Sequence, residues 1–335
     1  MADHLVLLAP SSNRVYAGAA DKLVAAELAI LLGGSAPVEA LQLAGVGYLA
    51  LDLSELDQPT TAALGRLSAA YALFRRGQGQ LLPVPLEVPD RFDDDLVTIP
   101  KYPGKTNEQF TRLLVNVTLA SLRRAPSGPV TVLDPMCGRG TTLSTALVLG
   151  HDAAGVESDL KAVEAYAAFL RTYLRRKRLK HSADMSPVRR EGMSLGRRLD
   201  VTVTPAGGGR PQSLTVFSGD TRQSAALHGR RRFDAVVVDA PYGIVHRSQA
   251  TEGRRDRSAA GLLWESVGVW AGQLKGGGAL GISWNTLGLT RERLVDLVGQ
   301  AGLEPLDSEP YRRFGHRVDS SIHRDVLVAV KPSAP

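Results

Sequence analysis

Two short segments of this 335-residue chain combine residue types and spacings that could do chemistry. The stronger one is VTVLDPMCGRGTTLSTAL at 130–147, where an apolar strand leads into Asp134, a turn with Gly138 and Gly140, and a helix. Glycines let a backbone approach a ligand closely, and the helix start offers unpaired N–H groups. A dinucleotide fingerprint would need a third glycine at Leu143, and no Gly-Lys-Ser/Thr follows, so the spacing disfavours a pyrophosphate ligand. Asp134 could instead bind the ammonium of an amino-acid ligand, or it could simply cap the turn.

The second segment is FDAVVVDAPYG at 233–243, an apolar strand that ends at Asp239 and continues into Ala240, Pro241 and Tyr242. A purely structural turn would more often carry Gly or Asn than an aromatic residue there. An exocyclic amine of a base is a poor nucleophile, because its lone pair is delocalised into the ring. Acceptors on Asp239 and the Ala240 carbonyl could hold both amine hydrogens and stabilise positive charge as a methyl group is transferred. Tyr242 could stack on the base.

Two further carboxylates follow predicted strands. Glu157 in GVESD lies about twenty residues after the glycines, where an acidic side chain commonly accepts hydrogen bonds from a ribose diol. Asp220 in GDT could accept a hydrogen bond from an adenine amino group. Each has a structural alternative, because Glu157 and Asp220 could equally cap the helices that follow them.

The elements that would position these residues alternate between strand and helix from about residue 129 onward. Continuous apolar strands separated by helices indicate an α/β fold with a parallel sheet covered on both faces. One of the helices is predicted over 159–178. The stretch 180–212, rich in Arg, Gly and Ser, interrupts the alternation and is expected to be a partly mobile insertion. The predicted strands lie at 130–134, 153–158, 213–220, 233–241, 279–286 and 325–331.

The first 85 residues form a separate pattern that predicts a small α+β module. We expect strands at 4–10 and 46–53 and a helix at 19–33. A second helix is predicted from Leu64, Leu67, Tyr71 and Phe74, which recur at helical spacing.

A proline-rich linker is expected at 86–106, because proline fixes φ and removes a donor. The larger domain then occupies 107–335, and its first helix should begin near Asn107, a good N-cap.

These motifs resemble known ones. DPMCGRGT (134–141) looks like the S-adenosyl-L-methionine motif of class I methyltransferases, and DAPY (239–242) resembles the Asp/Asn-Pro-Pro-Tyr signature of their amino-methylating branch. KYPGKTNEQF (101–110) and FGHRVDSSIHRDVLVAV (314–330) are similar to segments of the two-domain, THUMP-related tRNA guanine amino-methyltransferases. The resemblance covers residues 101–330. It implies a doubly wound, seven-stranded sheet whose last strand is antiparallel, behind a ferredoxin-like or THUMP-related N-terminal module.

The resemblance also implies roles for single residues and a reaction. The methionine part of S-adenosyl-L-methionine would lie against the 134–141 motif, its ribose on Glu157 and its adenine on Asp220, while the target base would lie at 239–242. The implied reaction is methylation of a guanine amino group in RNA, with tRNA as the expected substrate. The alternatives are a DNA adenine or cytosine amino-methyltransferase and a decayed RNA-binding protein, with Ala240 in place of the first signature proline as its sign. The motif residues expected to bind the cofactor are Asp134, Met136, Gly138, Gly140 and Thr141.

Charge and composition bear on partners. The net charge is +6, yet residues 171–198 hold ten Lys/Arg against two acidic residues. Such a patch suits nucleic acid, RNA before DNA, although a solvated helix end and loop would look the same. The basic stretch 246–257 could grip phosphates or be a solvated loop.

Other features of the sequence predict no membrane span, no signal peptide and no metal site. No apolar run approaches the ~20 residues of a membrane span, and the start lacks a signal peptide's basic region, so we expect a cytoplasmic protein. The lone Cys137 allows no cysteine metal cluster and is interpreted as packing. His316 and His323 are interpreted as surface histidines and not metal ligands, so no metal is expected.

Overall fold

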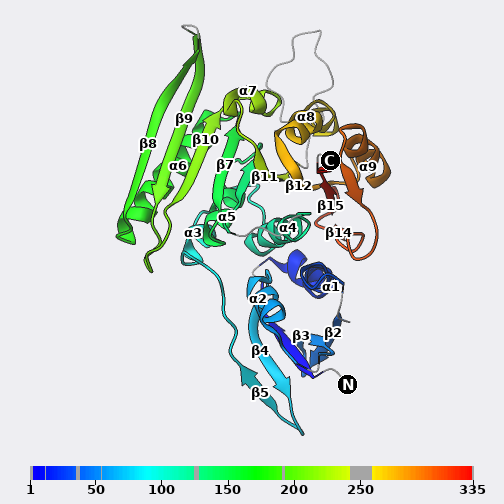
Figure 1. Ribbon diagram of the computed structural model, residues 1–335. Coiled ribbons are helices and arrows are strands. Elements are labelled where there is room, and N and C mark those ends of the chain that lie inside the picture. Colours follow the sequence, from blue (N-terminus) through cyan, green and yellow to red (C-terminus); the bar gives the residue numbers. More distant parts are fainter. Residues whose placement is uncertain are drawn as a thin grey trace.

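The computed structural model describes residues 3–11, 13–34, 38–53, 55–123, 128–190, 193–241 and 259–333. These residues form a five-stranded antiparallel sheet and a larger ten-stranded mixed sheet. Helices α1 (Arg14–Leu31) and α4 (Glu108–Ala120) pack against each other between the two sheets (Figure 1). The apolar core of the large sheet continues through α4 into one face of α1, which joins the two parts.

The N-terminal sheet has the strand order β2-β3-β1-β4-β5, with every described pair antiparallel. Its core is formed by apolar residues of the strands, the second face of α1 and the helix α2, among them Val6, Leu28, Leu49 and Leu64. The α+β character predicted for this part is confirmed. The bounds are β1 (His4–Leu8), β2 (Val38–Leu43), β3 (Val46–Leu51), α2 (Gln58–Arg66), β4 (Ala70–Arg76) and β5 (Leu81–Val84).

The helix predicted through Tyr71 and Phe74 is wrong. Helix α2 ends at Arg66, and the following residues form strand β4, which pairs with β1 and β5. Leu73 is buried in the core, whereas Tyr71 on the same strand is 69 % exposed. The aromatic and apolar residues fit a half-buried strand once a pairing partner is available, and that long-range pairing overrides the helical spacing.

The large sheet has the order β13-β15-β12-β11-β6-β7-β10-β9-β8, with β14 paired to β15. The order places the Asp134 strand directly beside the Asp239 strand, since Val132 pairs with Ala235 in parallel. The bounds are β6 (Thr131–Asp134), β7 (Asp152–Glu157), β8 (His181–Arg190), β9 (Met193–Val203), β10 (Gln212–Ser218), β11 (Phe233–Asp239), β12 (Leu274–Asn285), β13 (Glu304–Leu306), β14 (His316–Arg317) and β15 (His323–Val330).

Seven of these strands reproduce the expected doubly wound sheet, in the order β10-β7-β6-β11-β12-β15-β13 with β15 antiparallel to its neighbours. The insertion at 180–212 departs from the expectation. Its described residues form the long hairpin β8–β9, which pairs with β10 and extends the sheet instead of leaving it as a mobile loop (Figure 1). Buried Leu199 and Val201 on β9 belong to the main core, and this burial explains why the hairpin is ordered.

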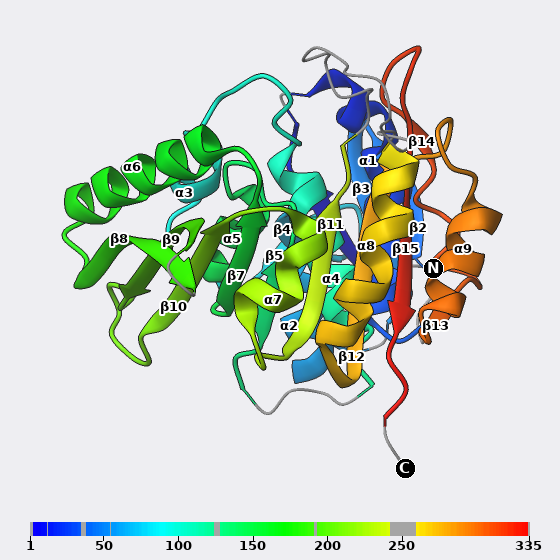
Figure 2. The same ribbon diagram turned by 90° about the horizontal axis from the view of Figure 1, so that it is seen from above.

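Helices cover both faces of the large sheet, as expected for a doubly wound fold (Figure 2). One core cluster includes side chains of α4, α5 (Thr141–Val148) and α6 (Leu160–Arg176). The other includes side chains of α8 (Ala259–Gln273) and α9 (Arg291–Gln300), and the short α7 (Ser224–His228) packs beside α8. Neighbouring β11 residues Val236 and Val237 fall into different clusters, because successive strand side chains point to opposite faces.

Residues 86–106, which were expected to form an extended linker, pack against the large domain. They include the short helix α3 (Asp95–Thr98) and bury Phe92 and Leu96 in the main core. The Arg91 N–H donates to the carbonyl of Val148 at 2.7 Å. Beyond them, α4 begins where predicted, because the Asn107 side chain caps it by accepting a hydrogen bond from the Phe110 N–H at 3.0 Å.

Candidate active site

Four carboxylates lie at one edge of the large sheet because four adjacent parallel strands end there. In the order β10-β7-β6-β11, these strands lead into Asp220, Glu157, Asp134 and Asp239. The ladders pair Ser218 with Glu157 and Asp134 with Gly155, so the ends are in register. The sheet therefore brings together residues that are up to 105 positions apart in the sequence.

The glycine turn after β6 is fixed by backbone geometry and packing. Gly138 and Gly140 have φ values of +52° and +79°, in the left-handed region that side chains disfavour. A Cβ on Gly140 would lie 2.3 Å from the Tyr166 ring, so packing excludes a side chain there as well. The Gly138 N–H donates to Glu157 Oε2 at 2.8 Å, which ties the turn to the end of the neighbouring strand.

Asp134 is 2 % exposed and accepts a hydrogen bond from the Met136 N–H at 3.0 Å. Burial raises its pKa to about 7, and the charges of Asp239 and Glu157 act in the same direction against the hydrogen bonds from Met136 and Thr142. A buried carboxylate with carboxylate neighbours is electrostatically unfavourable by itself. A cationic ligand group at this edge would relieve that cost.

Glu157 and Asp220 border a cavity of about 120 Å³, which Met136 and Leu262 also line. Pockets that enclose whole drug-sized ligands measure ~300 Å³ or more, so this cavity can hold only part of such a molecule. Glu157 Oε1 accepts from the Asp159 N–H at 2.7 Å. The Asp159 side chain, in turn, caps α6.

Asp220 shows the capping interaction that was one of its two predicted roles. It caps the short helix η1 (Thr221–Gln223) by accepting from the Arg222 N–H at 2.8 Å. The Arg222 guanidinium also bonds the carboxylate and lowers its pKa, and it bridges to Glu265 at 2.7 Å. Asp220 remains beside the cavity, with its charge already partly compensated.

At the predicted amine-binding segment, Asp239 is half-buried and Ala240 is 1 % exposed. The Ala240 N–H donates to the Ser283 carbonyl at 2.8 Å, so the neighbouring strand β12 fixes the backbone where the related signature has proline. Pro241 follows as an exposed residue. Tyr242 and the basic stretch 246–257 lie outside the described residues.

Residues 102–106 also contribute to this edge, which was not predicted from the sequence. The Thr106 hydroxyl donates to Asp239 Oδ2. Tyr102 hydrogen-bonds Thr141 Oγ1 at 2.9 Å, and the exposed Arg139 guanidinium lies 5.0 Å above the Tyr102 ring. Only the resemblance of KYPGKT to the family segment could have directed attention here, since no local pattern links it to Asp239.

The basic segment 171–198 is spread over the end of α6 and the β8–β9 hairpin. Several of its charges are already paired: Lys177 with Asp93 and Asp95, Arg197 with Glu164, and Arg198 with Asp200. Its excess positive charge is therefore smaller at the surface than the residue count suggests.

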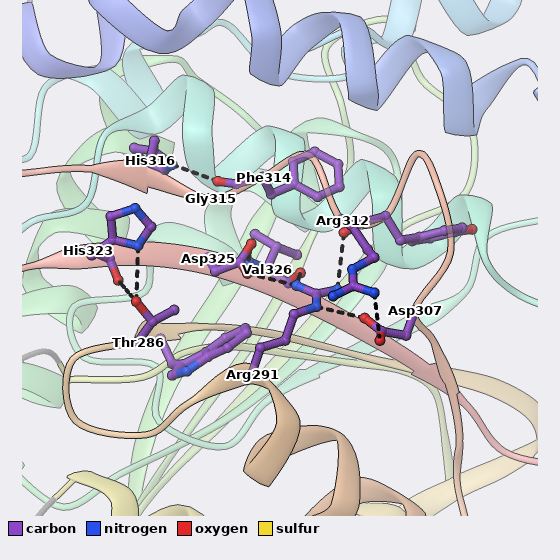
Figure 3. Close-up of polar contacts among 12 residues, drawn as sticks. Thr286, Arg291, Asp307, Arg312, Phe314, Gly315, His316, His323, Asp325 and Val326 are labelled. Carbon is purple, nitrogen blue, oxygen red and sulfur yellow. Dashed lines mark hydrogen bonds and ion pairs between the residues drawn. The ribbon is translucent and has the colours of Figure 1, made fainter.

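The two histidines of the C-terminal segment differ in environment (Figure 3). His323 is exposed, as expected, and its Nδ1 lies 3.0 Å from Thr286 Oγ1. The prediction of a surface His316 is wrong: it is 7 % exposed, its Nδ1 bonds the Phe314 carbonyl at 2.8 Å, and its ring packs on Phe110. Its pKa is lowered to about 4, mainly because the ring is buried. No local pattern predicts this burial, because the covering Phe110 belongs to a helix about two hundred residues earlier.

The remaining predictions concern Cys137, metal ligands and membrane spans. Cys137 is buried, and burial raises the pKa of its thiol. No group of three or more His, Cys, Asp or Glu side chains suited to a metal ion occurs within the described ranges. No helix in the same ranges is both long and apolar enough to cross a membrane.

No protein-family model matches the sequence, and neither does any curated protein. Solved structures with a similar fold include precorrin-6y C5,15-methyltransferase from Geobacter metallireducens (14 % identity, 69 % of this chain and 93 % of that chain, TM-score 0.38). A 16S rRNA N2 methyltransferase from T. thermophilus, in complex with AdoMet and guanosine, has 16 % identity over 88 % of this chain and 58 % of that chain, with a TM-score of 0.37. An rRNA methylase from Streptococcus thermophilus has 11 % identity over 65 % and 96 %, with a TM-score of 0.36. Similarities with TM-scores this low do not assign a function to this chain.

Proposed function

We propose that this chain transfers a methyl group from S-adenosyl-L-methionine to the exocyclic amino group of guanine in RNA, with tRNA as the first substrate to test. The observation that carries the proposal is the row of strand-end carboxylates Asp220, Glu157, Asp134 and Asp239, followed by the backbone acceptor of Ala240. The resemblance of 134–141 and 239–242 to methyltransferase motifs supports the same assignment.

The donor set suits the proposed cofactor. Asp134 offers a buried negative charge to an ammonium group, and its pKa of about 7 indicates that a cation there would be stabilising. Glu157 and Asp220 line the small cavity, where a ribose and an adenine have carboxylate acceptors. No side chain caps the start of α5 at Gly140, so its first N–H groups could meet a polar ligand. When bound, S-adenosyl-L-methionine supplies an electrophilic methyl group.

The chain's own residues would then orient the amine. The Asp239 carboxylate and the Ala240 carbonyl each accept one amine hydrogen, which directs the nitrogen lone pair away from them. Positive charge develops on the nitrogen during the substitution, and the Asp239 carboxylate stabilises it. Thr106 holds Asp239 Oδ2, and the bond from the Ala240 N–H to Ser283 fixes the peptide that precedes the Ala240 carbonyl. Preorganised acceptors of this kind cost no rearrangement during the reaction.

The decisive experiment supplies labelled S-adenosyl-L-methionine with tRNA, rRNA or duplex DNA and identifies the modified nucleoside by mass spectrometry. We expect N-methylated guanine in tRNA. Methylated adenine or cytosine in DNA would establish the alternative substrate. No saturable binding of S-adenosyl-L-methionine in isothermal titration would show a decayed enzyme.

Replacing Asp239 with Ala should reduce turnover ~10²–10³-fold while leaving cofactor affinity nearly intact, because its contact strengthens in the transition state. The matched control is Asp234→Ala, at the amino-terminal end of the same strand, where Asp234 pairs with Lys275. Near-normal turnover of the Asp239 variant would show that the amine site is assigned wrongly.

A further inference from the structure

The β14–β15 hairpin carries exposed basic side chains at the same sheet edge as Asp239. The ladder pairs Arg317 directly with His323, so the two side chains lie on one face of the hairpin, and both are exposed. The opposite pair, His316 and Arg324, is buried, and the Arg324 guanidinium lies 4.4 Å above the Phe110 ring. The inner face of the hairpin is therefore buried against α4, and its outer face is exposed and basic.

A third basic side chain, from the N-terminal part of the chain, lies beside the hairpin. The exposed Lys22 of α1 places its Nζ 3.5 Å from the Gly315 carbonyl. The His323 ring adjoins the same residue, with Cε1 3.5 Å from where a Gly315 Cβ would stand (Figure 3). Burial is the main cause of the lowered pKa of His316, and the charges of Arg324, His323 and Lys22 lower it further. Cations from two parts of the chain therefore converge around Gly315.

The described residues neutralise this cluster only in part. Neither Lys22 nor Arg317 forms an ion pair with a described side chain, and the Arg317 Nε donates to the Asp319 backbone carbonyl. The Asp319 carboxylate is engaged by the Ser321 N–H and hydroxyl at 2.7 and 2.8 Å. Asp325 is paired with Arg291 at 2.7 Å.

The orientation of the His323 ring is also fixed. The Thr286 Oγ1 atom lies 3.0 Å from His323 Nδ1 and 3.1 Å from the His323 carbonyl, so Nδ1 is engaged by this hydroxyl. Nε2 therefore faces away from this bond and makes no hydrogen bond to any described residue. As an N–H donor, Nε2 would bond an anion beside Arg317.

The strand ladders place this cluster close to the proposed amine site. Asp239 pairs with Ser283 of β12, and Asn285, two residues further along β12, pairs with Arg324 of β15. Strand β15 lies two strand spacings of ~4.8 Å from the Asp239 strand and β14 lies three, so the hairpin is about 10–14 Å to its side. Stacked nucleotides rise ~3.4 Å each, so this is about three to four nucleotides from a base held at Asp239.

We propose that Lys22, Arg317 and His323 bind adjacent backbone phosphates of the RNA, a few nucleotides from the one held at Asp239. The inference rests on the proposed function, and it gives the N-terminal module a direct part in substrate binding through Lys22. Phosphate contacts from Lys and Arg fix the register of a nucleic acid on a protein without reading its sequence.

The test measures binding of a fluorescein-labelled tRNA transcript by anisotropy over a range of salt concentrations, with no methyl donor present. The double variant Lys22→Ala/Arg317→Ala removes two exposed cations. It should bind more weakly, and its log–log salt slope should fall by ~1.4, at about 0.7 per phosphate contact on a single strand. The matched control is Arg230→Ala/Arg232→Ala, which removes two exposed cations just before β11, at the opposite edge of the sheet.

An affinity and slope equal to those of the unmodified protein would overturn the proposal, as would an equal loss in the control. A loss seen with duplex DNA but not with tRNA would overturn the RNA assignment. If the double variant does not fold, the two single variants, on separate elements, should each lower the slope by ~0.7. Methyl transfer is assayed separately, so reduced binding without any methylated product would refute the proposed function and leave the phosphate site standing.

Discussion

Replacing Glu27 with Gln is expected to remove a pH-dependent loss of stability at the junction of α1 and α4. Glu27 is fully buried, and its carboxylate accepts hydrogen bonds from Ser68 and from the Asn116 amide at 2.7 Å. Burial, the largest effect, raises its pKa to about 7 against these hydrogen bonds and the charge of Arg112. A Gln there can keep the shorter contacts: its oxygen accepts from Asn116 and the Ser68 N–H, and its amide donates to the Ser68 hydroxyl, while only the 3.3 Å contact of the Ser68 N–H with the second oxygen is lost.

The magnitude and sign follow from proton linkage. The pKa of Glu27 is raised from 4.5 in the unfolded chain to about 7 in the folded one. The stability it contributes is therefore fully present below pH 4.5 and is lost as the pH rises to about 7, where the folded carboxyl also ionises. At 1.36 kcal/mol per pH unit, the loss is about 3 kcal/mol. Gln carries no titrating proton, so the variant should not show it.

Urea denaturation of both proteins between pH 4.5 and 8.5 tests this reasoning. The stability of the unmodified protein relative to the Glu27→Gln variant should fall by about 3 kcal/mol across this range. Asp134 also titrates near pH 7, but it is present in both proteins and cancels in the difference. Glu164→Gln, at an exposed ion pair with Arg197, is the matched control and should show little change. Parallel stability curves for the Glu27 variant and the unmodified protein would refute the argument.

Two further predictions concern the proposed cofactor site. The affinity for S-adenosyl-L-methionine should rise with pH up to about 7, because only the ionised Asp134 attracts an ammonium group. Asp134→Asn should bind more weakly and lose that pH dependence in isothermal titration, and an unchanged profile would assign the ammonium elsewhere. Gly140→Ala should destabilise the protein in thermal or urea denaturation by clearly more than Gly138→Ala. Both positions have positive φ, a strain of ~1–2 kcal/mol for Ala, but only at Gly140 would the Cβ meet the Tyr166 ring, at 2.3 Å. Equal losses for the two variants would show that the Tyr166 contact relaxes easily.

The sequence alone determined those features that depend on neighbouring residues. The strand before Asp134, the left-handed turn at Gly138 and Gly140 and the helix after it follow one another within eighteen positions, so local pattern was enough to predict them. The Asn107 cap was predicted for the same reason. Because parallel strands in a doubly wound sheet end at one edge, the strand-end position of Asp239 was also readable once the α/β alternation was recognised.

The domain boundaries and the roles of the site residues remain predictions, since the fold alone does not test them. What the tertiary structure decided depends on partners distant in the chain. The β8–β9 hairpin is ordered because β10 offers it a pairing edge and the core accepts Leu199. Tyr71 lies in a strand because the segment around it, β4, pairs with β1 about sixty residues earlier, where helical spacing had predicted a helix.

The candidate site shows the same division. Its carboxylates were predicted, but Thr106 was not, because the hydrogen bond to Asp239 spans 133 residues and leaves no periodic signal. The burial of His316 depends on Phe110, and the cations around Gly315 come from α1 and the last hairpin. Local residue order fixes which backbone conformations and strand ends form, since those depend on nearby hydrogen bonds and side-chain alternation. Burial, pairing edges and charge clusters arise only when distant segments pack together.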